Sequence, residues 1–196
     1  MDAPEDDALM KLVRSGDRAA FDRRVQRHLD SVHRYLVRLT PSPADADELA
    51  QETFLRMWQR AASYRPGQVR LTTWLHRIAH NLAVDRFRRQ RGESVSLDAP
   101  EALSATDGTA LPDEQIGLAR TGRVLERAIA ALPANQRAAL ILCQVQGFSN
   151  RETARILGVS VRGVESLIAR ARRTLRRNLD AAESAAGAGS DDHESS

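Results

Sequence analysis

Cysteine is almost absent from this chain of 196 residues, which has Cys143 alone. One cysteine excludes an intrachain disulfide framework and any metal site built from several thiolates. Its run of apolar neighbours, 138–142, favours the role of a small buried hydrophobe. No apolar run approaches the ~20 residues of a membrane span, and the acidic start, 1–7, lacks the basic-then-apolar order of a signal peptide. These absences predict a cytoplasmic protein.

Lysine and recognisable catalytic groups are also scarce. Lys11 is the one lysine among 29 basic residues. A GC-rich genome produces such a bias towards arginine, so the placement of the arginines is more informative than their number. We find no Gly-rich phosphate loop, no nucleophile with its base and no isolated carboxylate pair. The sequence therefore predicts a protein that is not an enzyme and has no cofactor, metal or small-molecule substrate.

Charge and composition divide the chain into four segments. From 93 to 119 it carries six acidic residues and no basic one, with Pro, Gly, Ser and Thr among them, which is typical of a linker. The last residues, 180–196, form an acidic tail rich in Ala, Gly and Ser, for which we expect disorder. Helical periodicity without strand-like alternation predicts an all-α fold. We expect helical domains at 5–92 and 117–179, a flexible acidic linker at 93–116, and the tail.

Three long helices are predicted in the first domain. Apolar residues recur every three or four positions from Asp17 to Leu39. A second helix is expected to start at Ser42-Pro43, with Ser as cap, and to run to about Ser63. A third is expected from Trp74 to about Arg91, capped by Thr72 or Thr73. A weaker helix spans 7–13.

The second of these helices combines polar and aromatic side chains beside its apolar stripe. Asp47, Gln51, Phe54 and Trp58 lie on adjoining turns. A carboxylate, an amide and two large aromatic rings are typical of a protein-binding surface. Alternatively, Phe54 and Trp58 close the core of a three-helix bundle, and periodicity favours neither interpretation.

The third helix has a basic flank. Seven arginines and one carboxylate, Asp85, lie between Arg65 and Arg91. Arginine neutralises phosphate, Asn hydrogen-bonds base edges and aromatic rings stack on unpaired bases. A solvated charged face is the alternative. His76 and His80 are spaced to share a metal, but without a third ligand we expect surface or DNA-facing histidines instead.

A helix-turn-helix pattern occupies 147–178. Ser149 is placed to cap a short helix, Gly158 supplies a tight turn, and Ser160 caps a second helix that runs to about Asn178. Eight arginines against two glutamates lie between Arg151 and Arg177. Such a second helix reads the major groove, so this unit predicts DNA binding, with a solvated αα-hairpin as the alternative.

Three segments together resemble the extracytoplasmic-function (ECF) sigma factors, the short sigma-70 family members that keep the second and fourth sigma domains. Residues 45–58 resemble the core-binding segment, residues 74–89 resemble the helix that follows it, and the helix-turn-helix is opened by Leu132-Pro133-Ala134-Asn135-Gln136-Arg137. The resemblance covers about residues 5–179. It implies sigma domain 2 at 5–92 and sigma domain 4 at 117–179.

The resemblance implies three binding surfaces. The first docks on the β′ clamp of core RNA polymerase and comprises Asp47, Glu48, Gln51, Glu52, Phe54 and Trp58. The second opens and reads the −10 element and comprises Arg65, Arg70, Trp74, Arg77, Asn81, Asp85, Arg88 and Arg89. The third reads the −35 element and comprises Ser149, Arg151, Ser160, Arg162, Glu165, Ser166, Arg170 and Arg173. Glu165 and Leu167 stand where family members often carry basic residues, so the −35 sequence is not transferable by analogy.

The resemblance also implies partners and control. We expect binding to the β′ and β subunits of core polymerase and to promoter DNA, and sequestration by an anti-sigma factor, which would tether the chain at the inner membrane if that factor were membrane-bound. The stress or envelope regulon is implied by the family as well. Two rivals are a ligand-controlled repressor that binds a palindrome as a dimer, and an adaptor that binds polymerase without reading promoters. The 45–58 segment argues against the first, and the arginine-rich last helix against the second.

Overall fold

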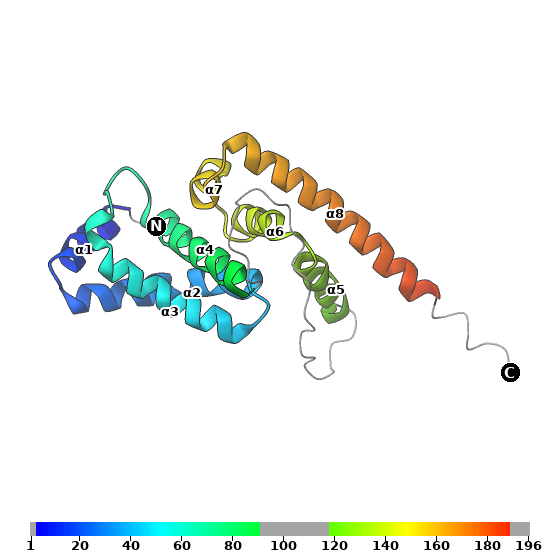
Figure 1. Ribbon diagram of the computed structural model, residues 1–196, viewed down its shortest axis with the longest axis horizontal. Coiled ribbons are helices and arrows are strands. Elements are labelled where there is room, and N and C mark those ends of the chain that lie inside the picture. The colour runs from blue at the N-terminus through cyan, green and yellow to red at the C-terminus, as the bar shows by residue number, and fades with distance from the viewer. Residues whose placement is uncertain (1–2, 91–117, 189–196) are drawn as a thin grey trace.

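The computed structural model describes residues 3–90 and 118–188, which are helical with short connections and contain no strand (Figure 1). The expected all-α fold is confirmed. No helix in these two ranges is long and apolar enough to cross a membrane. The elements of the first range are α1 (Ala3–Arg14), α2 (Arg18–Leu39), α3 (Pro43–Gln59), the short 3-10 helix η1 (Ala61–Ser63) and α4 (Leu71–Gln90). Those of the second are α5 (Leu118–Ala130), α6 (Ala134–Leu140), the π-helical turn η2 (Ile141–Val145), α7 (Asn150–Leu157) and α8 (Val161–Ala188).

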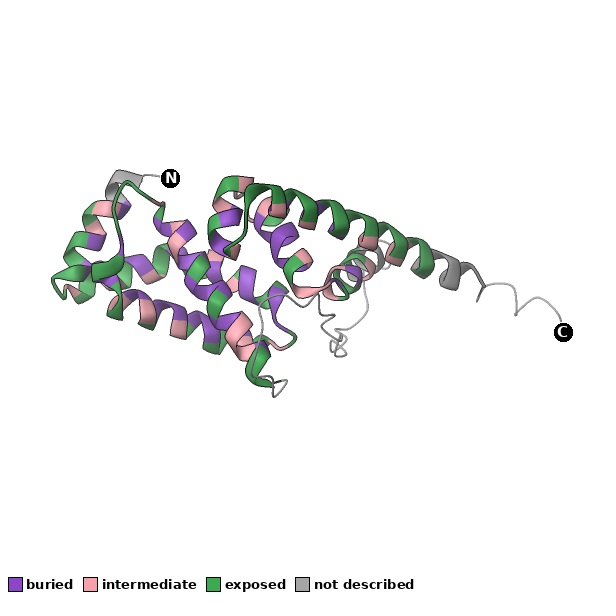
Figure 2. Ribbon diagram, turned by 45° about the horizontal axis from the view of Figure 1, so that its top comes forward, coloured by how far each residue is buried: buried purple, intermediate pink, exposed green. Residues whose placement is uncertain are grey.

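Helices α2, α3 and α4 form a bundle around one apolar core (Figures 1 and 2). Each contributes side chains that recur at helical spacing, such as Leu36 from α2, Met57 from α3 and Leu75 from α4, which are fully buried. Helix α1 covers one side and is fastened by carboxylates. Asp6 pairs with the buried guanidinium of Arg24, and the Tyr64 hydroxyl donates to Asp7 at 2.7 Å.

The starts of the helices follow local capping chemistry only in part. Asp17 caps α2 by accepting from the Ala20 N–H at 3.0 Å. Pro43 opens α3 as expected, but Ser42 makes no side-chain capping bond, and α3 ends at Gln59 rather than near Ser63. Helix α4 begins at Leu71, three residues before the expected start. Thr72 and Thr73 lie inside the first turn of α4, so the expectation that one of them caps the helix is wrong.

The helix-turn-helix forms as the sequence predicts. Ser149 and Glu152 make a reciprocal capping box at the start of α7. Gly158 adopts a φ of +69°, a left-handed conformation that favours glycine and turns the chain sharply. Ser160 then accepts from the Gly163 N–H at 3.0 Å and caps α8. Cys143 is half-buried, with its Sγ 3.2 Å from the hydroxyl of Thr153.

Helix α8 is longer than its sequence pattern indicated. It continues ten residues past Asn178, to Ala188, so the first half of the expected disordered tail is helical. Alanine has the highest intrinsic helix propensity, and the segment after Asp180 is rich in it. The remaining tail and the acidic linker lie outside the described residues.

The two helical domains pack on each other. Helix α7 lies against α4, and α6 and η2 lie against α2 (Figure 1). Ile141, Leu142 and Ile156 of the second domain are buried in the same apolar cluster as the core of the first. The expectation of two domains related by a linker therefore omitted a direct contact between them.

Phe54 of α3 lies in the core of the bundle and not on the expected docking surface. It is only 4% exposed and lies in the core between α3 and its neighbours. The expectation that Phe54 belongs to an exposed docking surface is wrong, and the alternative, that it closes the bundle core, is correct. The reason is that position 54 falls on the same stripe as Ala50 and Met57, which face α2 and α4.

We expect Phe54→Ala to lower the free energy of unfolding by about 3–5 kcal/mol, because it leaves a cavity in a packed core. The adjacent Leu55 is 49% exposed, so Leu55→Ala should change stability by less than ~0.5 kcal/mol. Urea denaturation followed by circular dichroism compares the two variants. Equal, small losses would place Phe54 outside the core.

Candidate functional site

A row of polar side chains lies on the solvent face of α3. Asp47, Glu48 and Gln51 are exposed, and Glu52 is half-buried. These residues recur at steps of one, three and four, so they share one side of the helix, opposite Leu49, Thr53 and Met57. The surface is acidic and built on a rigid element, as a docking site for a basic partner requires.

Each of the three carboxylates on this surface already has a nitrogen-bearing side chain as a neighbour. Asp47 lies 2.8 Å from Nε2 of His33 on α2, and Glu52 accepts from Arg56 at 2.8 Å. Glu48 pairs with Arg86 of α4. Exposed polar pairs of this kind contribute little to stability, so a basic partner can replace these neighbours at small cost. Gln51 lies on the same face and is exposed.

Arg86 is a residue whose role the sequence did not reveal. Its guanidinium reaches from α4 to two carboxylates of α3, Glu48 and, at 3.3 Å, Asp45. It therefore ties the acidic surface to the basic helix. In the sequence Arg86 is one of seven arginines between residues 65 and 91. Only the packing of the helices reveals which arginine of α4 faces α3.

Trp58 is half-buried rather than free. Its ring packs edge-on against Phe21 of α2, with centroids 5.2 Å apart. Part of the indole remains available at the end of the acidic row. Of the two aromatic residues in the expected docking set, one is therefore in the core and one is at its margin.

The basic face of α4 points away from α3. Arg77, Asn81, Arg88 and Arg89 are exposed, while Leu75, Ala79 and Leu82 on the other side are buried. Asp85 is half-buried on the same helix. A helix with guanidinium groups and an amide on one exposed side suits a nucleic-acid backbone and its base edges.

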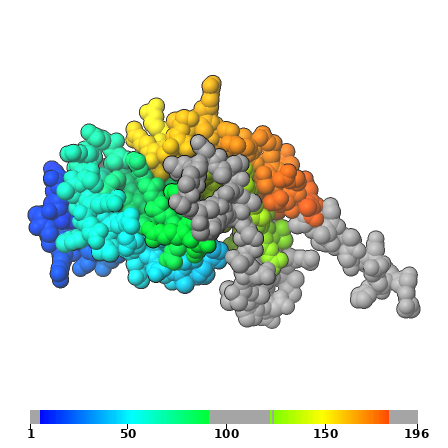
Figure 3. Space-filling view, in the orientation of Figure 1, coloured from blue at the N-terminus to red at the C-terminus, as the bar shows by residue number. Residues whose placement is uncertain are grey.

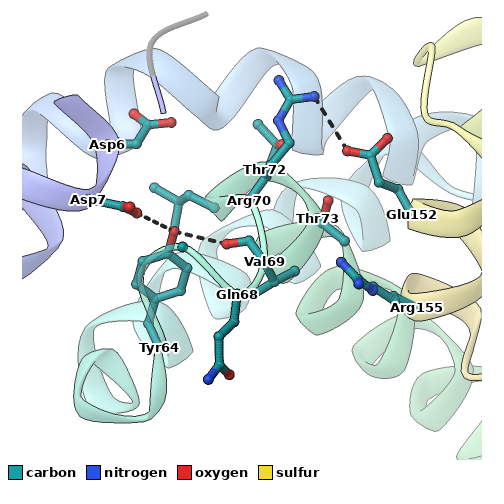
Figure 4. Close-up of a pocket in the computed structure, with 12 residues that line it drawn as sticks. Asp6, Asp7, Tyr64, Gln68, Val69, Arg70, Thr72, Thr73, Glu152 and Arg155 are labelled. Atoms are coloured by element: carbon teal, nitrogen blue, oxygen red, sulfur yellow. Dashed lines mark hydrogen bonds and ion pairs between the residues drawn. The ribbon is translucent and has the colours of Figure 1, made fainter. Parts of the chain in front are cut away.

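The loop before α4 brings two more expected DNA contacts to the same end of the bundle. Arg65 and Arg70 are exposed, and Trp74 is half-buried beside Tyr64, with ring centroids 5.4 Å apart. Tyr64 is itself fixed, because its hydroxyl donates to Asp7 and lies 3.2 Å from the Val69 carbonyl (Figure 4). The indole of Trp74 therefore packs against a side chain that is itself fixed in position.

His76 and His80 lie inside the protein, so the expectation that they face solvent or DNA is wrong. His76 is 1% and His80 6% exposed. Nδ1 of His76 donates to the Thr72 carbonyl at 2.8 Å, and Nδ1 of His80 lies 2.9 Å from the Tyr35 hydroxyl. Both imidazole rings pack between α4 and α2, and one ring nitrogen of each has a hydrogen-bond partner. No group of three His, Cys, Asp or Glu that could hold a metal occurs in the described part of the chain.

The second basic surface lies on the helix-turn-helix. All eight residues expected to read the −35 element are exposed, and exposed residues follow the outer face of α8 (Figure 2). Val164, Ile168 and Ala171 are buried on the opposite side. This leaves the arginines of α8 turned outward, namely Arg162, Arg170, Arg172, Arg173, Arg176 and Arg177.

Two residues of this set, Ser149 and Ser160, also have structural roles. The Ser149 hydroxyl donates to Glu152 at 2.7 Å and accepts from its N–H at 3.2 Å, and Ser160 caps α8. Their hydroxyls therefore stabilise the starts of α7 and α8. Arg162 and Ser166 lie one turn apart on the first part of α8, where a recognition helix contacts base edges.

Comparison with known proteins shows which family the chain belongs to. Profiles described as Sigma-70 region 2 and Sigma-70 region 4 match residues 24–93 and 122–175. The chain is 37% identical to the ECF RNA polymerase sigma factor SigM of Mycobacterium tuberculosis, over 84% of this chain and 80% of that protein. The chain belongs to the ECF sigma factors.

Other ECF sigma factors show the same relationship. The chain is 34% identical to the ECF RNA polymerase sigma-E factor of Salmonella typhimurium, over 87% of this chain and 92% of that protein. It is 38% identical to the ECF RNA polymerase sigma factor SigE of Mycolicibacterium smegmatis, over 84% of this chain and 65% of SigE.

Solved structures of sigma factors have the same fold. CnrH, solved in complex with the cytosolic domain of CnrY, matches with a TM-score of 0.64 at 28% identity, over 92% of this chain and 99% of CnrH. The sigma factor RpoE of Bartonella quintana, solved with the anti-sigma factor NepR, matches with a TM-score of 0.61 at 25% identity, over 82% and 96% of the two chains.

The buried histidines make the stability of this ECF sigma factor depend on pH. Burial, assisted at His28 by Arg24 and Arg27, lowers the pKa of His28, His76 and His80 to about 4. Between about pH 6.5 and about pH 4 the unfolded chain binds more protons than the folded one, so the free energy of unfolding falls as the pH falls. Above that window the contribution is complete.

Urea denaturation at several pH values between about 4.5 and about 7 measures this slope. We expect His80→Gln to flatten it by removing one of the three titrating groups. Phe54→Ala is a matched control, because it lowers stability without removing a histidine and should keep the wild-type slope. Stability that stays constant across the window would contradict the neutral state of the three imidazoles.

Proposed function

We propose that this chain binds core RNA polymerase and directs it to promoters with −10 and −35 elements. The observation that carries the proposal is the combination of one exposed acidic surface on α3 with two separate exposed basic surfaces, on α4 and on α8. A repressor with a ligand-binding domain needs neither the acidic row nor the basic face of α4. An adaptor that only bound polymerase would not need the arginines of α8.

Docking on polymerase is assigned to α3. Asp47 and Gln51 are exposed one turn apart, and the ion pairs of Asp47, Glu48 and Glu52 can be exchanged for those of a basic partner. The partner proposed is the β′ clamp, with further contacts to the β subunit. Trp58 would add apolar contact at the edge of this surface.

Recognition of the −10 element is assigned to α4 and to the loop before it. The exposed guanidinium groups of Arg77, Arg88 and Arg89 would hold the phosphates, and Asn81 would hydrogen-bond a base. Removing a base from the stack costs a few kcal/mol. Its capture by this surface would help to hold the strands apart. Within helix α4, Trp74 and the buried Phe87 are the only Phe, Tyr or Trp residues, so we expect dependence on well-matched promoters.

Recognition of the −35 element is assigned to the first turns of α8. Arg162, Ser166 and Arg170 would reach bases and phosphates of the major groove. Glu165 is exposed on the same face, and a carboxylate there would accept from a cytosine amino group rather than hold a phosphate.

Control by an anti-sigma factor is part of the proposal. CnrH and the RpoE of Bartonella quintana were both solved with such partners or their cytosolic domains. The chain would act in the cytoplasm, where polymerase and promoters are, in the service of a stress or envelope response.

We expect Asp47→Ala combined with Gln51→Ala to weaken binding to purified core polymerase, because both side chains are exposed at the centre of the acidic surface. A matched control is Asp22→Ala with Gln26→Ala, the same pair of residue types at the same spacing on the exposed face of α2. Surface-immobilised core polymerase measures both affinities. Equal affinity of the two double variants would remove α3 as the docking surface.

We expect Arg162→Ala to relax base preference at a single −35 position by about 1–3 kcal/mol if Arg162 reads a base. Transcription from a panel of promoters, each with one changed −35 base pair, measures this preference. Arg176→Ala, about four turns further along the exposed face of α8, is the control. A loss of equal size on every promoter would identify Arg162 as a phosphate contact.

A further inference from the structure

Helix α1 contributes no residue to the three proposed binding surfaces, yet it lies beside the loop that precedes α4. The space-filling view shows α1 in blue at one end of the molecule, where its surface adjoins the cyan surface (Figure 3). Its neighbours are α2, η1 and α4. The loop of residues 64–70 joins η1 to α4, so α1 is placed to influence how that loop is held.

The orientation of α1 is fixed by its contacts with the bundle. Met10 and Val13 are buried in the apolar core. Asp6 is 8% exposed and pairs with the buried guanidinium of Arg24 on α2. The next residue, Asp7, points about 100° away around the helix, and its carboxylate meets the loop instead of α2.

Asp7 accepts a hydrogen bond from Tyr64, the residue at which the loop begins (Figure 4). The Tyr64 hydroxyl lies 2.7 Å from Oδ1 of Asp7 and 3.2 Å from the carbonyl oxygen of Val69, near the other end of the loop. The hydroxyl has one hydrogen to donate, and the shorter contact, with Asp7, is the stronger bond. The Tyr64 oxygen therefore joins α1 to both ends of the loop.

Close packing does not support the loop beside this bond. Asp6 and Asp7 of α1 and residues 67–73 line a cavity of about 240 Å³ (Figure 4). An empty space offers the side chains around it no contacts on that side. The hydrogen bond between Asp7 and Tyr64 therefore has a larger share in fixing the loop than it would have in a packed interior.

The ring of Tyr64 transmits this constraint to Trp74. Tyr64 is 2% exposed, and its ring centroid lies 5.4 Å from that of Trp74, with the two planes inclined at 51°. The indole is half-buried near the start of α4. Asp7 is thus one hydrogen bond and one ring contact away from an aromatic side chain assigned to the −10 element.

We propose that α1 positions the −10 reader, because Asp7 fixes Tyr64 and Tyr64 fixes Trp74. The same bond steadies the loop that carries Arg65 and Arg70. This inference rests on the proposed function, since it concerns how side chains assigned to the −10 element are held. Asp7 and Tyr64 are positioning residues and need no contact with DNA. Side chains held in their bound geometry lose less conformational entropy on binding, so a loosened loop captures unpaired bases less well.

Two changes at position 7 separate geometry from charge. Asp7→Ala and Asp7→Asn each remove one negative charge, which by electrostatics alone strengthens binding to DNA phosphates. Asp7→Asn keeps a side-chain oxygen that accepts from Tyr64, whereas Asp7→Ala does not. We therefore expect Asp7→Ala to weaken −10 recognition and Asp7→Asn to retain it.

The two tyrosines of the chain provide a matched pair of variants. Tyr64→Phe removes the hydroxyl and keeps the ring. Tyr35→Phe is the control, because Tyr35 is fully buried and its hydroxyl lies 2.9 Å from Nδ1 of His80 in the bundle core, away from the loop. Asp7→Ala should have no further effect in a Tyr64→Phe background, since both changes break the same bond.

The fluorescence of Trp74 measures positioning in the free chain. Trp58→Phe leaves Trp74 as the single tryptophan. In that background we expect Asp7→Ala and Tyr64→Phe to raise the rate at which acrylamide quenches Trp74. Asp7→Asn and Tyr35→Phe should leave the rate unchanged. Circular dichroism checks that each variant is folded.

Strand opening measures the consequence, without the Trp58 change. On a promoter that the wild-type chain transcribes with core polymerase, permanganate reactivity reports unpaired thymines. We expect Asp7→Ala and Tyr64→Phe to reduce opening about two- to tenfold, the size expected for one lost hydrogen bond. Their affinity for core polymerase should be unchanged. Asp7→Asn and Tyr35→Phe should open the promoter as the wild-type chain does.

Three results would overturn the inference. The first is wild-type quenching and opening in Asp7→Ala. The second is an Asp7→Asn chain as impaired as Asp7→Ala, which would make charge the cause. The third is an equal loss in Tyr35→Phe and Tyr64→Phe, which would make general stability the cause.

Failure of the proposed function would give a different result. The wild-type chain would then open no promoter with core polymerase. The quenching of Trp74 would still decide whether α1 holds the loop, because it requires neither polymerase nor DNA.

Discussion

Helix α4 is packed on three sides, and most of the molecule depends on that constraint. It lies against α2, α3 and α7 at once, so Leu75, Ala79 and two buried histidines are turned inward and only one strip remains for solvent. The arginines and the asparagine of α4 are confined to this strip. The basic surface is therefore narrow and rigid, as recognition of a nucleic acid by fixed side chains requires.

The buried histidines follow from the same packing. A helix surrounded by three others needs bulky side chains on nearly every face, and His76 and His80 fill space against α2 while Thr72 and Tyr35 satisfy a ring nitrogen of each. Burial favours their neutral form. Residues that look like nucleic-acid or metal ligands in the sequence are thus part of the core that holds the reading helix in place.

Several charged side chains of the proposed binding surfaces already form ion pairs within the protein. Arg86 joins the acidic row of α3 to α4, and Glu152 joins the cap of α7 to Arg70. Each of these pairs is at least partly exposed, where an ion pair is weak and easily replaced. Docking on polymerase and placement on DNA would both replace internal pairs by external ones. Both binding steps would therefore be linked to internal contacts of α4 and α7.

The all-α class, the family and the helix-turn-helix could be predicted from the amino-acid sequence, because they depend on local patterns of residues. Helical periodicity, the Ser149–Glu152 box and the left-handed Gly158 are set by residues within a few positions of each other. The exposure of most charged residues in the three proposed binding surfaces was also predictable, since charged side chains on a helix face stay in water.

The burial of ambiguous side chains and the contact between the domains could not be predicted in this way, because both depend on packing between distant segments. The helical spacing of Phe54 and His76 is compatible with either an exposed or a buried position. Which position each residue takes depends on whether a neighbouring helix covers that face. The contacts of Gln146 with Ser31 and of Arg137 with Leu39 join residues about a hundred positions apart. No local pattern encodes them, because they arise from the fit of two folded surfaces.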